Sequence, residues 1–210
     1  MRYNRDMQKV KLYVADTDLG LKKKRFLLEN VSVGQKEKAL RFANEIDQIR
    51  SLLSSYLKNL LSREEVLKNE YGKPYFDNGP FFNISHSGKY VLMAVSTSEV
   101  GVDIEEMKNK DMSALVRIFN EAEAKMIKEH SDFYYLWCAK ESLIKCMGLS
   151  VSKVREMPGL PLNGLKTFKG KDYQCKSFIY DKHIVSITRE GNDEFEIETK
   201  KVDKLPYIMK

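Results

Sequence analysis

Apolar residues recur along the first third of the chain with the spacing of helices and short strands. Within residues 35–61 they return every three or four positions, which predicts one or two amphipathic helices. Lys11–Ala15 predicts an opening strand, and Lys22–Asn30 predicts a short helix. Arg63–Lys68 predicts a further helical turn, followed at Tyr71–Tyr75 by a turn that leads into extended chain.

The middle of the chain changes from strand-like to helix-like spacing. Valine-rich and aromatic segments separated by turn residues predict successive strands of an antiparallel sheet, at Phe81–Ser85, Tyr90–Ser96 and Gly101–Ile104. Helices are predicted next, at Ser113–Phe119, Glu121–Ser131 and Phe133–Met147. The second of these helices begins after Asn120, and Glu123 stands where a capping box requires it.

The end of the chain predicts a loop and then a strand meander. The loop is Leu149–Gly164, and the strands are Lys176–Tyr180, His183–Thr188 and Glu194–Lys200. Both halves therefore combine helices with an antiparallel sheet, which predicts an α+β fold of two similar lobes. We place the lobes at residues 1–101 and 102–210, with a cleft where they meet near Val100.

Composition narrows the class of protein. The formal net charge of +6 favours anionic partners such as phosphate esters or acidic proteins. The three cysteines have neither the even number of a disulfide framework nor zinc-site spacing, so we expect reduced, buried thiols. Without a signal peptide or an apolar run long enough for a membrane span, the sequence predicts a cytoplasmic protein with no membrane partner.

Candidate chemistry begins with two acidic residues in the segment Val100–Glu105. Side chains alternate along a strand, so Asp103 and Glu105 point to the same side. Two neighbouring carboxylates repel each other unless a cation lies between them, and Mg²⁺ prefers such oxygen ligands. A solvated strand edge is the alternative that this pair leaves open.

A second candidate is one face of the helix predicted at Phe133–Met147. Trp137, Glu141 and Lys145 follow one another at four-residue spacing and therefore share that face. Glu141 and Lys145 alone indicate a surface salt bridge. If the helix faces the strand that carries Asp103, Glu141 becomes a third carboxylate for the same cation.

Two turns offer groups that bind anions. Phe82–Gly88 runs from a strand into a polar turn with backbone N–H groups, hydroxyls and the imidazole of His86. The turn at Tyr71–Pro74 holds Lys73 between a glycine and a proline, which suits a phosphate contact. An ordinary hairpin corner and an ordinary exposed lysine are the alternatives.

These pieces stand in a defined order within residues 32–148. They are Gly72-Lys73-Pro74, Phe82–Gly88, Gly101–Glu105, Phe119 with Glu123, and Trp137 with Lys140-Glu141-Ser142 and Lys145. In this order they resemble the 4′-phosphopantetheinyl transferases of the Sfp, or surfactin-synthetase, type. The resemblance implies two similar α+β lobes in one monomeric chain, with the active site between them.

The resemblance also implies a reaction. The 4′-phosphopantetheine arm of coenzyme A passes to a serine hydroxyl of an acidic acyl or peptidyl carrier protein, and adenosine 3′,5′-bisphosphate leaves. Asp103, Glu105 and Glu141 resemble the Mg²⁺ ligands, and Mn²⁺ can substitute for Mg²⁺. Glu141 also resembles the catalytic general base, and Lys145 the catalytic lysine that contacts the transferred phosphate.

Further residues resemble the coenzyme A contacts of the family. Asp103 and Lys145 belong to that set as well, and the others are Lys38, Arg50, Lys73, Ser85 and His86. Two positions depart from the family pattern. Gln35 stands where some members have a lysine, and Ser150 stands where members commonly have a glycine.

Two other functions use the same residues. A two-metal nuclease or phosphatase would bind its metals through these carboxylates. The helices within residues 35–61 lack the aromatic interleaving of a nucleic-acid surface, so we expect no nucleic-acid partner. A basic adaptor for acidic proteins, with its carboxylates merely solvated, is the alternative that is not an enzyme.

Overall fold

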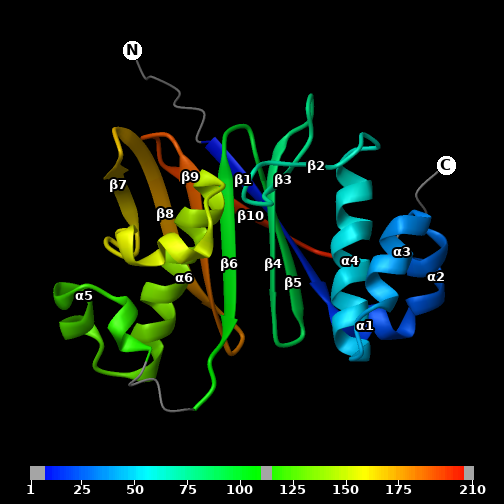
Figure 1. The fold of residues 1–210 in the computed structure, drawn as a ribbon, viewed down its shortest axis with the longest axis horizontal. Coiled ribbons are helices and arrows are strands. Elements are labelled where there is room, and N and C mark those ends of the chain that lie inside the picture. The colour runs from blue at the N-terminus through cyan, green and yellow to red at the C-terminus, as the bar shows by residue number, and fades with distance from the viewer. Residues whose placement is uncertain (1–7, 110–114, 206–210) are drawn as a thin grey trace.

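The structure is a computed structural model that describes residues 8–109 and 115–205, with helices and strands in both halves of the chain (Figure 1). The first half contains β1 (Gln8–Asp16), α1 (Thr17–Lys22), α2 (Lys24–Glu29), α3 (Val33–Leu40), α4 (Glu45–Leu61), β2 (Leu67–Lys68), β3 (Pro74–Tyr75), β4 (Phe81–Ser87), β5 (Tyr90–Ser96) and β6 (Val100–Glu106). The second half contains the 3₁₀ helix η1 (Val116–Ile118), α5 (Glu121–Met126), α6 (His130–Met147), the 3₁₀ helix η2 (Val151–Glu156), β7 (Gly164–Phe168), β8 (Lys171–Tyr180), β9 (His183–Glu190) and β10 (Phe195–Lys201).

The described strands form two four-stranded sheets and one small hairpin. The first sheet has the order β10-β1-β5-β4, the second has the order β6-β9-β8-β7, and β2 pairs with β3. All pairs are antiparallel except β1 with β10, which run parallel with Gln8 opposite Phe195. This arrangement confirms the α+β class.

Buried hydrophobic side chains connect α4 to the first sheet and the first sheet to the second. The helix α4 begins after Asn44, whose side chain accepts a hydrogen bond from Ile46 N, and it buries Leu52 and Tyr56 against the first sheet. The opposite face of that sheet packs on the second sheet, where Leu12 of β1 and Val102 of β6 belong to one buried cluster. In Figure 1, α1–α4 lie on one side of the two sheets and α5 and α6 on the other.

Most predicted elements are confirmed, with differences in their partners and ends. The strands predicted at residues 81–85 and 90–96 pair as β4 and β5, but the third predicted strand is β6, which joins β9 in the other sheet. The capping box of Asn120 and Glu123 is present, although α5 ends early, at Met126. Residues 113–114 of one predicted helix lie outside the described residues.

Some predictions from the sequence are wrong. Arg63–Lys68 is not helical, and its last two residues form β2. The predicted loop at 149–164 contains η2, which Ser150 caps through its side chain, so the serine that replaces a glycine has a local role. The meander ends at β9, because β10 returns to the first sheet.

The division into lobes at residues 101 and 102 stays a prediction. That boundary falls inside β6, directly after Gly101. The strand β10, which the division gives to the second lobe, completes the first sheet beside β1. A cut at residue 101 would therefore separate strands that pair with each other.

Candidate active site

The strands β4 and β6 meet at the seam between the two sheets through side chains. Every second residue of β4 points at β6, because side chains alternate along a strand. The contacts are Val102 N to Asn83 Oδ1 at 3.0 Å, Ser85 Oγ to Asp103 Oδ1 at 3.0 Å, and Ser87 Oγ to Glu105 Oε2 at 3.1 Å. The seam therefore fixes both acidic residues of β6 against the first sheet.

The helix α6 lies over this seam and completes a pocket of about 250 Å³. Gly101 permits the approach, because a Cβ there would lie 2.0 Å from the Ser142 carbonyl oxygen. The helix thus faces β6, which is the condition for Glu141 to approach the other carboxylates. The pocket is lined by Ile84, Ser85, His86, Asp103, Glu105, Trp137, Glu141 and Lys145.

Lys145 lies among the acidic side chains of this pocket. Its ammonium group binds Asp103 Oδ1 directly, lies 3.2 Å from Ser85 Oγ, and lies 3.8 Å from Glu141 Oε2. Burial lowers the pKa of Lys145, but the Asp103 and Glu141 carboxylates outweigh burial and raise the pKa above its ordinary value. Lys145 is therefore a cation at neutral pH.

Glu141 has a strongly perturbed acidity. Burial raises the pKa of Glu141 to about 7, and Asp103 and Glu105 act in the same direction while Lys145 opposes them. A carboxyl group with a pKa near neutrality exchanges protons readily at physiological pH. A carboxyl group of this acidity can act as a general acid or base.

The carboxylates have the right chemistry for Mg²⁺ but do not form a closed set of ligands. Their oxygens are the donors that Mg²⁺ prefers, and Asp103 Oδ2 is buried with no hydrogen-bond partner among the described residues. Within the described residues, however, no three Asp, Glu, His or Cys side chains are grouped closely enough to hold a metal ion. The proposed ligands share one pocket, and the metal assignment stays a prediction.

A second pocket, of about 160 Å³, lies beside the first on the side of α4. It brings together Lys38, Arg50 and His86, which the sequence placed near a phosphate. It also contains Lys58, which the sequence reasoning missed, although Arg50, Ser54 and Lys58 follow one another at the four-residue spacing of a helix face. The remaining lining residues are Phe42, Asp47, Ser51, Ser54 and Ser55.

The electrostatics of this basic pocket favour an anion. Burial, together with the charges of Lys38 and Lys68, lowers the pKa of Lys58 to about 8. Burial and the Arg50 guanidinium lower the pKa of His86. An anion would relieve the repulsion in both cases, since it stabilises the charged forms.

Arg50 is held in place from two sides. Its Nη1 donates to Asp47 Oδ1 at 2.8 Å, and its Nη2 donates to the carbonyl of Gly88 in the turn after β4. Its Nε is buried and has no hydrogen-bond partner within residues 8–109 and 115–205. A guanidinium has five N–H donors, so these two hydrogen bonds leave donors of a fixed group for a ligand in the pocket.

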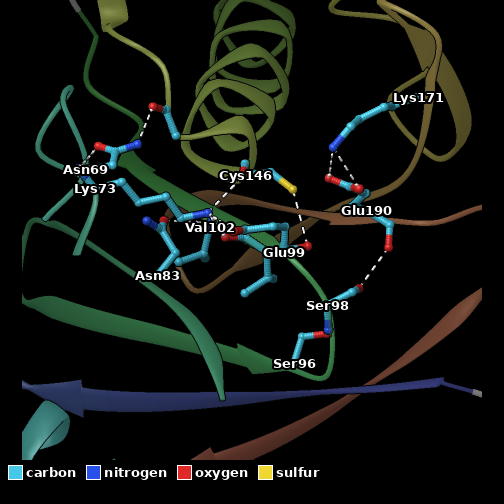
Figure 2. Close-up of polar contacts among 12 residues, drawn as sticks. Asn69, Lys73, Asn83, Ser96, Ser98, Glu99, Val102, Cys146, Lys171 and Glu190 are labelled. Atoms are coloured by element: carbon cyan, nitrogen blue, oxygen red, sulfur yellow. Dashed lines mark hydrogen bonds and ion pairs between the residues drawn. The ribbon is translucent and has the colours of Figure 1, made fainter. Parts of the chain in front are cut away.

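Two positions from the resemblance lie elsewhere. Lys73 lines neither pocket described above but a third one, of about 260 Å³, and its ammonium group contacts Glu99 and the carbonyls of Val100 and Cys146 (Figure 2). Gln35 completes a capping box with Ser32 at the start of α3, so the residue in place of a family lysine stabilises a helix end.

Two more sequence-based expectations can be compared with the structure. All three cysteines are free and buried, as expected. No helix within the described residues combines the length and the apolar character that a bilayer crossing requires.

Comparison with known proteins gives the family of the chain. The model of the 4′-phosphopantetheinyl transferase superfamily matches residues 99–186. The 4′-phosphopantetheinyl transferase gsp of Aneurinibacillus migulanus is 38% identical over 138 residues, which cover 59% of this chain and 58% of gsp. The match thus spans less than two thirds of that relative.

Longer matches exist with two proteins of Bacillus subtilis. The 4′-phosphopantetheinyl transferase Sfp of strain 168 is 34% identical over 170 residues, 73% of each chain. Another 4′-phosphopantetheinyl transferase of that species is 34% identical over 194 residues, 81% of this chain and 82% of the relative. This chain therefore belongs to the 4′-phosphopantetheinyl transferase family, and it is of the Sfp type.

Proposed function

We propose that this chain transfers 4′-phosphopantetheine from coenzyme A to a serine of an apo acyl or peptidyl carrier protein, with Mg²⁺ as the metal. One observation carries the proposal: His86 lines both the basic pocket and the carboxylate pocket, so the two are neighbours. Coenzyme A carries a 3′-phosphate and a pyrophosphate on one ribose, and these groups need two adjoining sites: a basic one, and one where carboxylates would hold Mg²⁺ for the pyrophosphate.

The basic pocket suits the 3′-phosphate. Lys38, Arg50, Lys58 and His86 offer donors there, and Arg50 Nε has no other partner in the described part of the chain. The pyrophosphate would then reach the carboxylate pocket beside Ser85. This placement gives Lys38, Arg50, Ser85 and His86 the roles that the family resemblance implies.

In the carboxylate pocket, Asp103, Glu105 and Glu141 would hold Mg²⁺. The ion would neutralise charge on the pyrophosphate oxygens. Lys145 would bind the phosphoryl group under attack and stabilise its charge. Because Lys145 contacts Asp103 in this structure, that role requires its ammonium group to turn from Asp103 towards the phosphate.

Glu141 would accept the proton of the carrier serine. The serine Oγ forms a bond to the phosphorus of the phosphopantetheine arm while the bond from that phosphorus to the bridging oxygen breaks. The electrons of the broken bond leave with adenosine 3′,5′-bisphosphate. The pKa of about 7 belongs to the site without metal, and bound Mg²⁺ would lower it, so Glu141 would be ionised at neutral pH and able to accept the proton.

The charge of the chain supports the proposed partner. Carrier proteins are acidic helical bundles, and a net charge of +6 favours docking with them. The proposal includes a monomer that acts in the cytoplasm, without nucleic acid or membrane as a partner.

The test is a mass measurement. The protein is incubated with coenzyme A, Mg²⁺ and a panel of unrelated apo carrier proteins, and each carrier is weighed by mass spectrometry. The expected result is a gain equal to one phosphopantetheine, abolished by a chelator and by Glu141→Gln. No gain on any carrier, together with hydrolysis of nucleic acid by the wild type, would overturn the proposal in favour of a nuclease.

A further inference from the structure

The last turn of α4 carries a lysine that faces the basic pocket without a partner. The ammonium group of Lys58 makes no hydrogen bond or ion pair within residues 8–109 and 115–205. The charges that lower its pKa, those of Lys38 and Lys68, are both positive. A partly buried cation among other cations is costly unless an anion joins it. Lys58 is therefore placed to receive an anionic ligand.

The charges that line the basic pocket match one phosphate monoester. Lys38, Arg50 and Lys58 supply three positive charges against the single carboxylate of Asp47, which leaves a formal excess of two positive charges. The Asp47 carboxylate is already paired, since it accepts from Arg50 Nη1 at 2.8 Å. The lowered pKa of His86 keeps its imidazole neutral before a ligand binds. A phosphate monoester carries about −1.5 to −2 charges at neutral pH, which balances this excess.

Gln35, which stands where some family members have a lysine, is held away from the ligand. Its Nε2 donates to Asn59 Oδ1, and Asn59 Nδ2 donates back to its Oε1, both at 3.1 Å. The same Oε1 accepts from the backbone N of Ser32 at 2.9 Å. Gln35 does not line the basic pocket. Its side chain therefore fastens α3 to α4 and gives the pocket no charge.

The charge that is missing at position 35 is present on the opposite helix. Lys58 directly precedes Asn59, the residue of α4 to which Gln35 is bonded. Gln35 and Lys38 lie three residues apart on α3 and share a face, and Lys38 lines the pocket. A lysine at position 35 would approach the pocket from α3, whereas Lys58 enters it from α4. The pocket thus has a second lysine although position 35 lacks one.

We propose that Lys58 determines the specificity of this chain for the 3′-phosphate of coenzyme A, and that it takes the place of the lysine found at the position of Gln35 in some family members. This inference rests on the function proposed above, in which coenzyme A occupies both pockets. Lys58 was not among the coenzyme A contacts that the family resemblance implied.

The test compares two ligands that differ only in the 3′-phosphate. The Kd values of coenzyme A and of 3′-dephospho-coenzyme A are measured by calorimetry at neutral pH for the wild type and for Lys58→Met, which removes the charge and keeps the length of the side chain. The matched control is Lys36→Met, which removes an equal charge from α3 at a residue outside the basic pocket. The ratio of the two Kd values isolates the contribution of the 3′-phosphate.

For Lys58→Met we expect the Kd of coenzyme A to rise about tenfold or more, because a charge-assisted hydrogen bond to the phosphate is lost. The Kd of 3′-dephospho-coenzyme A should stay within about twofold, since only screened, longer-range attraction changes. In Lys36→Met both Kd values should stay within about twofold of the wild type for the same reason.

Folding is checked by thermal unfolding of each variant. Lys58→Met should keep or raise Tm, because the lowered pKa means that the charged lysine costs stability in the ligand-free protein. Weaker binding of coenzyme A with native Tm is therefore a loss of the phosphate contact. An unchanged ratio of Kd values in Lys58→Met would overturn the proposal, whether both ligands bind normally or both bind equally weakly.

A double variant tests whether one lysine replaces the other. Gln35→Lys added to Lys58→Met returns the lysine to α3, and it should recover part of the preference for coenzyme A over 3′-dephospho-coenzyme A. Because Gln35→Lys also removes the amide pair with Asn59, Tm is measured beside the Kd values. No recovery at a native Tm would overturn the replacement of one lysine by the other.

The outcome is separable from that of the proposed function, because calorimetry needs no carrier protein. If the wild type binds coenzyme A but transfers nothing to any carrier, the proposed function fails while the two Kd values still decide the role of Lys58. If transfer is normal and Lys58→Met keeps its preference for coenzyme A, only this inference fails.

Discussion

The contact between α6 and β6 at Gly101 allows a prediction with a calculable size. Gly101→Ala would place a Cβ 2.0 Å from the carbonyl oxygen of Ser142 and 2.3 Å from the backbone N of Cys146. Real Cβ contacts are essentially never below 3.0 Å, so helix and strand must separate by about 1 Å. The opposing atoms are backbone atoms and cannot turn aside, so we expect the upper end of overpacking costs, about 3 kcal/mol.

For a chain of this size, 3 kcal/mol corresponds to a fall in Tm of roughly 6 to 12 °C. A displacement of about 1 Å between Asp103 and the groups on α6 should also lower kcat roughly 100-fold. The matched control is Gly34→Ala in α3, where an added Cβ meets no atom within 4 Å. Alanine there should leave Tm unchanged or raise it, since it favours the helix by up to about 1 kcal/mol.

The assays are thermal unfolding followed by circular dichroism and steady-state transfer to a carrier. A Tm for Gly101→Ala within 2 °C of the control, roughly the effect of less than 1 kcal/mol, with full kcat would refute the steric reasoning. A lower Tm with normal kcat would refute only the link between this contact and catalysis.

Three further predictions follow from charges in the two pockets. The pKa of Glu141 is raised from 4.5 to about 7 on folding. The stabilisation that protonated Glu141 contributes is therefore fully present below pH 4.5 and is lost as pH rises through 7. The free energy of unfolding of the metal-free protein should fall by up to ~3 kcal/mol over this range. Unfolding curves of metal-free Glu141→Gln should not show this fall. The pKa of Lys58 is about 8, so coenzyme A should bind with proton uptake at pH 8 that Lys58→Met abolishes, as calorimetry in two buffers will test. Asp103→Ala should end transfer while circular dichroism stays native, and remaining Mg²⁺-dependent turnover would contradict its role as a ligand.

Individual helices and strands could be predicted because the apolar spacing and the capping residues that define them lie within the segment itself. The continuous apolar run of Tyr90–Ser96 corresponds to β5 residue for residue, and Asn120 caps α5 as its spacing indicated. The partner of a strand is not encoded in its own periodicity. Phe195–Lys201 has the alternation of a meander strand, but it pairs with β1 at the other end of the chain. The short polar segment Arg63–Lys68 carries too weak a pattern to exclude a helical turn.

In the candidate site, too, features set by local sequence could be predicted, whereas contacts between distant elements could not. Alternation predicted that Asp103 and Glu105 share a side, and both line one pocket. Helical spacing put Glu141 and Lys145 on one face, and both point into that pocket as well. The contact between Lys145 and Asp103 could not be predicted, because it depends on how α6 crosses β6.

The order of polar residues along β4 decides which side chains lie in each of the two pockets. Its alternation directs Asn83, Ser85 and Ser87 to β6, whereas His86, between the serines, lines the basic pocket with Arg50 of α4. A register shift of one residue would exchange these two faces. The pairing of β4 with β5, which sets Ser85 opposite Leu92, therefore aligns Ser85 and His86 with the carboxylates of the other sheet. The relative position of the two pockets is thus set by the register of one strand, which is what a single substrate spanning both pockets would require.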